Sequence, residues 1–126
     1  MTVVLDAGAL VAIQRGDRML IAALKAELEA GRVPLTHGGV VGQVWRGGSG
    51  RQARLARAIG GVDVRAIDDD LGRRAGVLLG RAGRADVIDA ALVLLATDGD
   101  EIYTSDVDDL KPLAAACGKL LDLVGV

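Results

Sequence analysis

The chain has 126 residues, of which 51% are hydrophobic and 25% are charged, and its formal net charge is −2. This composition is typical of one globular domain over residues 1–126 with a core of its own. A single Cys and a single His exclude an internal disulfide and the zinc sites that need several such ligands. No apolar run approaches the ~20 residues of a membrane span, and no secretory signal is visible, so we expect a soluble cytoplasmic protein.

Charge is divided unevenly along the chain. Residues 46–84 carry nine Arg against four Asp, whereas residues 85–126 carry nine acidic residues against two Lys. Solvated helix faces are one explanation of such a distribution. A cationic rim beside an acidic centre, which a metal-dependent enzyme acting on a polyanion needs, is another. Because Trp45 and Tyr103 are the only aromatic residues, contacts to a nucleic acid would depend on charge and backbone rather than on stacking.

The hydrophobic pattern predicts strands that alternate with helices. In chain order we expect a strand at 2–5, helices at 7–14 and 18–30, a strand at 33–36, helices at 40–45 and 51–59, a strand at 62–67, helices at 70–81 and 86–97, a strand at 101–104, a helix at 108–116 and a strand at 119–124. Gly31 and Gly83 fit helix ends, and 47–50 (GGSG) is expected to be a flexible break. Short apolar strands between helices predict an α/β fold with a parallel sheet covered on both faces.

Acidic residues stand where such a fold places its functional sites, outside the carboxyl ends of the strands. Asp6 directly follows the first expected strand, and Asp106 follows the fourth. Asp86 begins the apolar helix at 86–97, where a helix cap is an equally good explanation, and Asp89 lies one turn later. Asp89 has no such explanation, because an unpaired carboxylate inside an apolar run is costly to bury.

Several carboxylates gathered at one edge would repel each other unless a cation lay between them. Oxygen ligands without His or Cys favour Mg²⁺ or Mn²⁺. Such a cation activates water and polarises a phosphoryl oxygen. The pattern therefore permits a metal-dependent phosphodiesterase, although it does not require one.

Four segments together resemble the PIN-domain ribonucleases, in particular bacterial toxins of the VapC type. They are VVLDAGALVAI at the start, VVGQVWR in the middle, DVIDAALVLLA near residue 90 and IYTSDVDDL near residue 105. The resemblance covers essentially the whole chain, in order. It implies a three-layer α/β/α sandwich with a five-stranded parallel sheet in the order 3-2-1-4-5. It also implies an endoribonuclease that depends on Mg²⁺ or Mn²⁺, a homodimer, and a cognate antitoxin protein that blocks the site.

The resemblance also assigns roles to individual residues. Asp6, Asp86 and Asp106 match the catalytic, metal-binding acids of the family, and Asp89 is a further candidate ligand. The auxiliary positions are the hydroxyl residues before Asp106 and one more acid after it, which are Thr104, Ser105 and Asp109.

One position departs from the family pattern. Gln43 stands where a Glu is usual, in GQVWRG. An amide adds no charge, so metal affinity and activity are expected to fall unless Asp89 supplies the missing charge. The alternative function is therefore a catalytically weakened PIN-like module that binds protein or RNA.

The basic segment supplies candidate contacts to the RNA backbone. They are Arg46, Arg51, Arg54 and Arg57. The pattern G-x-G-x-x-A at 48–53 is disfavoured as a dinucleotide site because no strand is expected before it. His37 is expected to be a polar loop residue rather than a base, and Trp45 a residue of the core or of a dimer interface.

Overall fold

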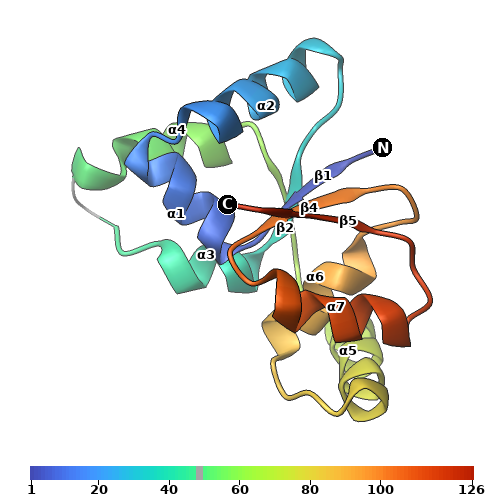
Figure 1. Ribbon diagram of the computed structural model, residues 1–126. Coiled ribbons are helices and arrows are strands. Elements are labelled where there is room, and N and C mark those ends of the chain that lie inside the picture. The colour runs from blue at the N-terminus through green and yellow to red at the C-terminus, as the bar shows by residue number, and fades with distance from the viewer. Residues whose placement is uncertain (48–49) are drawn as a thin grey trace.

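The computed structural model describes residues 1–47 and 50–126, and its centre is a five-stranded parallel sheet (Figure 1). The strands are β1 (Val3–Leu5), β2 (Leu35–His37), β3 (Asp63–Arg65), β4 (Glu101–Thr104) and β5 (Asp122–Gly125). They lie in the order β3-β2-β1-β4-β5, which confirms the predicted topology. β1 is central: Val4 pairs with Leu35 on one side and with Ile102 on the other.

Helices cover both faces of this sheet, as the predicted sandwich requires (Figure 1). One layer consists of α1 (Ala7–Arg15), α2 (Arg18–Glu29), α3 (Gly38–Val44) and α4 (Ala53–Ile59), with the short 3₁₀ helix η1 (Gly50–Gln52) before α4. The other consists of α5 (Asp69–Ala82), α6 (Val87–Leu95) and α7 (Val107–Ala116). Among the described residues, no helix is both long enough and apolar enough to cross a membrane.

The core between the layers is aliphatic. All of β1 is buried, and so are the four consecutive residues of α6 from Ala90 to Val93. A central parallel strand is covered on both faces, which explains why it is a continuous apolar run rather than an alternating one. Each fully buried Leu, Ile or Val contributes ~1.5–3 kcal/mol relative to exposure. Trp45 lies outside this core, with 42% of its surface exposed.

Asp residues stand at the N-caps of helices in both layers. The capping residues are Asp6 for α1, Asp17 for α2, Asp68 for α5, Asp86 for α6 and Asp106 for α7. All but Asp106 accept a backbone N–H of the first turn with the side chain, which satisfies a donor that the helix leaves free. The chain has fourteen Asp but only three Glu, and capping accounts for part of this excess.

Two strands, β2 and β5, begin two or more residues later than predicted. Pro34 has no N–H to give to a ladder, so the pairing of β2 starts at Leu35. β5 starts at Asp122 because backbone N–H groups before it are used elsewhere: Lys119 donates to the carbonyl of Ala114 in α7 at 3.2 Å, and Leu120 donates to Oδ1 of Asp98 at 2.9 Å. The break expected at 47–50 includes residues 48 and 49, which lie outside the described residues.

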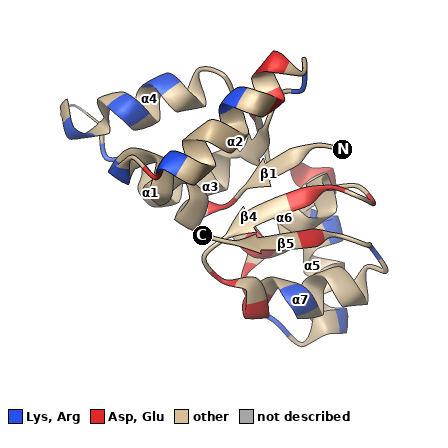
Figure 2. Cartoon of the chain, turned by 45° about the horizontal axis from the view of Figure 1, so that its top comes forward, with Lys and Arg blue, Asp and Glu red and all other residues tan. Residues whose placement is uncertain are grey.

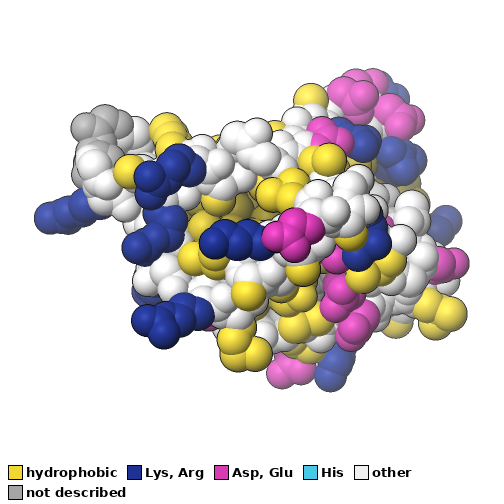
Figure 3. Space-filling view, turned by 90° about the horizontal axis from the view of Figure 1, so that it is seen from above, with side chains coloured by type: hydrophobic (Ala, Val, Ile, Leu, Met, Phe, Trp, Pro, Cys, Tyr) yellow, Lys and Arg dark blue, Asp and Glu magenta, His cyan; other side chains and the backbone are white. Residues whose placement is uncertain are grey.

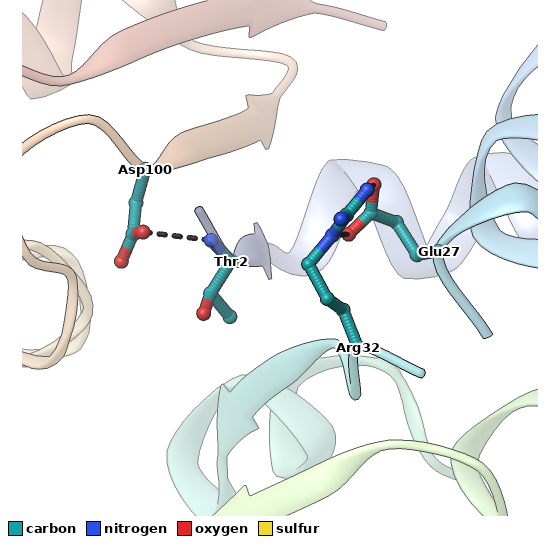
Figure 4. A network of polar contacts seen from close by, with 4 residues as sticks. All are labelled: Thr2, Glu27, Arg32 and Asp100. Atoms are coloured by element: carbon teal, nitrogen blue, oxygen red, sulfur yellow. Dashed lines mark hydrogen bonds and ion pairs between the residues drawn. The ribbon is translucent and has the colours of Figure 1, made fainter. Parts of the chain in front are cut away.

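Buried carboxylates near the amino ends of the strands are fully paired (Figure 4). Asp100, 3% exposed, accepts the N–H of Thr2 at 2.7 Å and that of Thr97 at 2.8 Å. Glu27, 7% exposed, forms a two-bond ion pair with Arg32, at 2.7 and 3.0 Å. Burial is tolerated here because each charge has its own donors.

Candidate active site

A cavity of about 430 Å³ opens where the carboxyl ends of β1 and β4 meet the first turns of α1, α6 and α7. Most of the polar residues expected to act together line it. They are Asp6, Gln43, Arg46, Asp86, Asp89, Ser105, Asp106 and Asp109. Figure 2 shows the acidic segments that follow β1 and β4 at this edge, and the basic segments on α4 at some distance from them. Residues up to about 100 positions apart in the chain thus form one acidic surface.

Asp6 is held rigidly at the end of the central strand. Its Oδ1 accepts the N–H of Ala9 at 2.9 Å as the N-cap of α1, and the residue is only 7% exposed. Burial raises the pKa of Asp6, and the charge of Asp106 adds to the rise. Hydrogen bonds from Thr104, Ala9 and Ser105 offset part of this increase. The Asp6 side chain is therefore held in one position, and its hydrogen bonds offset only part of the rise in its pKa.

The first turn of α6 carries two of the acids. Asp86 caps the helix: its Oδ1 accepts the N–H of Ile88 at 2.9 Å and that of Asp89 at 3.2 Å. Asp89 is half-buried, and its pKa is raised to about 6, first by burial and then by the charges of Asp86, Asp6, Asp109 and Asp106. A carboxyl that titrates near neutrality in a cavity of other acids is a mark of a functional site.

The β4–α7 connection places the third acid. The N–H of Asp106 donates to Oγ1 of Thr104 at 2.8 Å, and within the described residues its carboxylate makes no cap bond. Thr104 is fully buried beneath the cavity, so it positions Asp6 and Asp106 instead of lining the site. Ser105 does line it, and a Cβ at Gly8 would collide with the Ser105 side chain, so the start of α1 approaches this loop closely only because residue 8 is Gly.

The remaining wall comes from α3. The Gln43 side chain is exposed at the cavity. Arg46 lies at the same wall, but its guanidinium folds back onto the end of α3 and donates to the carbonyls of Gly42, Gln43 and Trp45 at 2.8–3.2 Å. The positive charge of Arg46 therefore lies at the cavity wall, while its N–H groups are bonded to carbonyls at the end of α3.

His37 is not the polar loop residue that the sequence suggested. It is fully buried as the last residue of β2 and the N-cap of α3. Its Nδ1 accepts the N–H of Gly39 at 3.1 Å, so Nε2 carries the proton and donates to the carbonyl of Ile88 at 2.9 Å. Burial lowers the pKa of His37, which keeps the ring neutral. His37 thereby ties α3, with Gln43, to the first turn of α6. Its position between a predicted strand and a predicted helix was the available signal.

The donor chemistry of the cavity fits a hard divalent cation. Carboxylate, amide and hydroxyl oxygens are the ligands that Mg²⁺ and Mn²⁺ prefer, and a cation would relieve the repulsion that raises the pKa of Asp89. Across residues 1–47 and 50–126, however, no three Asp, Glu, His or Cys side chains are already placed to hold an ion together. Asp6 and Asp86 each direct one oxygen to a helix N-terminus instead.

The other Arg residues expected to bind RNA lie away from this cavity. Arg54 and Arg57 border an apolar groove of about 420 Å³ between α2 and α4, and Arg54 donates to the carbonyl of Gln14 at 2.9 Å. Figure 3, a view onto this face, shows the hollowed hydrophobic surface beside Lys and Arg side chains. Arg51 lies in η1 and does not line the acidic cavity. RNA contact by these three residues stays a prediction.

Comparison with known proteins gives a match in structure only. No protein-family model matches the chain, and no curated protein matches its sequence. Among solved structures, the chain is similar to one in the crystal structure of VapBC2 from Rickettsia felis bound to a DNA fragment from their promoter. The match covers 98% of both chains with a TM-score of 0.72 and 12% sequence identity. The predicted resemblance is thus confirmed at the level of the fold: this chain has the PIN-domain fold.

Proposed function

We propose that this chain is a metal-dependent endoribonuclease that acts as the toxin of a toxin–antitoxin pair. The observation that carries the proposal is the acidic cavity, in which five Asp residues gather and the pKa of Asp89 is raised to about 6. Carboxylates that are spread over a surface are explained by solvation or helix capping. Carboxylates that repel each other within one cavity, at the carboxyl edge of a parallel sheet, are typical of a cation site.

The ligands would be Asp6, Asp86, Asp89 and Asp106, with Ser105, Asp109 and Gln43 around them. Asp6 would act from a fixed position because three hydrogen bonds hold it. Asp106 would be the more adjustable ligand, since it makes no cap bond in the described part of the chain. Asp89 would supply the charge that Gln43 lacks.

When bound, Mg²⁺ or Mn²⁺ would lower the pKa of a water and polarise a phosphoryl oxygen of RNA. The first turns of α1, α6 and α7 all face this cavity, so their N–H groups favour negative charge there. This helps both the clustered carboxylates and an incoming phosphate. Arg46 would place a positive charge at the wall toward which the RNA backbone approaches.

Cleavage of a mixed RNA pool tests the proposal. The wild-type chain should cut it in Mn²⁺, EDTA should stop the reaction, and Asp6→Asn should be inactive. Asp68→Asn is a matched control, because Asp68 caps α5 in the same manner without lining the cavity. Cleavage that persists in EDTA, or that Asp6→Asn retains, contradicts the proposal.

A second candidate function rests on Gln43. With an exposed amide in place of an acid, the cavity has a lower negative charge and a weaker grip on a cation. In that case the chain would be a PIN-like module that binds RNA or protein without cutting. Failure of the wild type to cut RNA, followed by EDTA-sensitive cleavage by Gln43→Glu, would identify it.

The groove between α2 and α4 suits the partner of such a toxin. Its floor is apolar, with Ile21, Leu24 and Leu28 among its lining, and Lys25, Arg54 and Arg57 border it. This combination fits an acidic amphipathic helix, whose apolar side would fill the groove while its charges meet the rim. We assign this occupant to the cognate antitoxin, and we expect the toxin to be a cytoplasmic homodimer.

The partner assignment has its own test. Co-expression with the DNA-binding protein of an adjacent reading frame should suppress the toxicity of the chain. Leu28→Glu, a change at a half-exposed groove position, should restore toxicity under co-expression without altering cleavage by the isolated chain. Suppression that Leu28→Glu leaves intact would place the partner elsewhere.

A further inference from the structure

A second, larger cavity continues from the acidic one along α1. It has a volume of about 660 Å³, and it runs from the start of α1 to the turn after that helix. Four residues line both cavities, Ala7, Gly8, Gln43 and Ser105, so the two form one continuous channel. None of the roles proposed above uses the α1 part of this channel.

The floor of the α1 channel is made of small side chains. Gly8, Val11 and Ala12 of α1, all half-buried, line the channel, and so does Val44 of α3. From Ala7 to Arg15 the helix rises ~12 Å, enough for a few nucleotides of an extended strand. Neither aromatic residue of the chain lines this channel, so it offers a strand contacts to its backbone and no stacking platform.

Polar groups occur at both ends of the channel. At the junction with the acidic cavity, the Gln43 amide and the Ser105 hydroxyl offer hydrogen-bond donors without negative charge. At the far end stands Arg15, the only Lys or Arg in the lining; it is exposed and has no hydrogen-bond or ion-pair partner within the described residues. Asp17 also lines this end, but its Oδ1 is engaged in capping α2 through the N–H of Leu20 at 3.0 Å.

We propose that the α1 channel binds the single-stranded RNA segment on one side of the cleaved phosphodiester, with Arg15 as the contact to a distal phosphate. In this arrangement the Gln43 side chain contacts the RNA directly. At the mouth of the channel an amide donates to a phosphate oxygen, which a carboxylate would repel. Gln43 is then a substrate-positioning residue at the junction of the two cavities rather than only a weakened metal ligand.

This inference rests on the proposed nuclease function, and the experiment separates the two. A labelled single-stranded RNA and a dinucleotide are titrated into the chain in Ca²⁺ by fluorescence anisotropy and by competition, and both are then cleaved in Mn²⁺. The variants are Arg15→Ala, which removes the distal charge, and Val11→Trp, which fills the channel at a residue outside the packed core. Arg18→Ala is the matched control, since Arg18 is an exposed Arg of α2 that does not line the channel.

Arg15→Ala should raise the Kd for the longer RNA several-fold and lower the salt dependence of log K by about 0.7, the value for one phosphate contact to a single strand. Val11→Trp should also weaken the longer RNA, while both variants bind and cut the dinucleotide like the wild type. Unchanged Kd and salt dependence in both variants, with wild-type cleavage intact, would overturn the channel assignment and leave the nuclease proposal standing. A wild type that neither binds nor cuts RNA would overturn both.

Discussion

The two edges of the sheet treat buried carboxylates in opposite ways. Before the strands begin, Asp100 and Glu27 are each satisfied by their own donors, and the ion pair with Arg32 lowers the pKa of Glu27 (Figure 4). After the strands end, burial and mutual repulsion raise the pKa of Asp6 and Asp89. The acids of the first edge are compensated by their own donors, whereas those of the second edge retain mutual repulsion, as we propose for acids that bind a cation.

This contrast shows that the partners of a buried acid indicate its role better than the number of acids nearby. Asp6 and Asp100 are both nearly inaccessible, and both accept backbone N–H groups. They differ in their neighbours: Asp106 stands beside Asp6, whereas the hydrogen-bond donors Thr2 and Thr97 surround Asp100.

Removing charge from the acidic edge should affect activity most. Asp6→Asn keeps an acceptor for the Ala9 N–H but loses the charge, so we expect cleavage to fall at least about 100-fold. Its melting temperature should stay close to the wild-type value, because the lost carboxylate is one whose charged form burial disfavours. Initial rates on RNA, with circular dichroism as the check on folding, measure both. Retained activity in a folded variant contradicts the assignment of Asp6.

Removing charge from the opposite edge should affect stability instead. Asp100→Ala leaves the N–H groups of Thr2 and Thr97 without their acceptor and should cost about 2 kcal/mol of unfolding free energy. Asp100→Asn retains an acceptor and should cost less. Urea unfolding measures both values, and Mn²⁺ affinity should be unchanged in the Asn variant. If Asp6→Asn loses as much unfolding free energy as Asp100→Ala, the proposed difference between the two edges of the sheet is wrong.

Adding charge to the acidic edge should strengthen metal binding. Gln43→Glu brings a further carboxylate to the cavity wall, and we expect Mn²⁺ affinity to rise by about tenfold, the equivalent of ~1.4 kcal/mol. Isothermal titration with Mn²⁺ gives the value. Gln14→Glu is a suitable control, since residue 14 is a Gln of α1 that does not line the cavity. An unchanged affinity would mean that residue 43 does not face the ion.

The smallest effect concerns Asp89 and pH. Because its pKa rises from 3.8 to about 6 on folding, the destabilisation by its charged form is complete above pH 6, and stability should rise as the pH falls from about 6 toward 4. Asp89→Asn should gain about 1 kcal/mol at pH 7, a value reduced for the solvent screening of a half-exposed group. It should also lose part of the pH dependence and bind Mn²⁺ more weakly. Unchanged Mn²⁺ binding would show that Asp89 does not replace the missing acid.

Much of the architecture was accessible from local patterns. Apolar runs bounded by Asp and Gly predicted the strands and helices, because a buried parallel strand and a capped helix are both local in sequence. The strand order was predicted only by the resemblance to the PIN-domain ribonucleases. Asp6, Asp86 and Asp106 were identifiable because each stands at the end of a strand or the start of a helix.

What local patterns missed depends on contacts between distant segments. His37 is buried where it bonds to Ile88, 51 residues away, and the backbone just before β5 is bonded to Asp98 and to α7. The positions of Arg54 and Arg57 beside α2, and of Arg15 on the channel, follow from how α1, α2 and α4 pack. The charge pattern indicated a basic region but not which cavity each Arg borders.

Calorimetric titration of the wild-type chain with Mn²⁺ at pH 6, in two buffers of different ionisation enthalpy, addresses the acidic cavity most directly. If these carboxylates jointly capture a divalent ion, binding should release protons, because a carboxyl with a pKa of about 6 is half protonated beforehand, and Asp6→Asn should lose most of the affinity. The proposal that these carboxylates bind a divalent cation would be contradicted if Mn²⁺ did not bind. It would also be contradicted if Mn²⁺ bound without proton release and bound Asp6→Asn equally well.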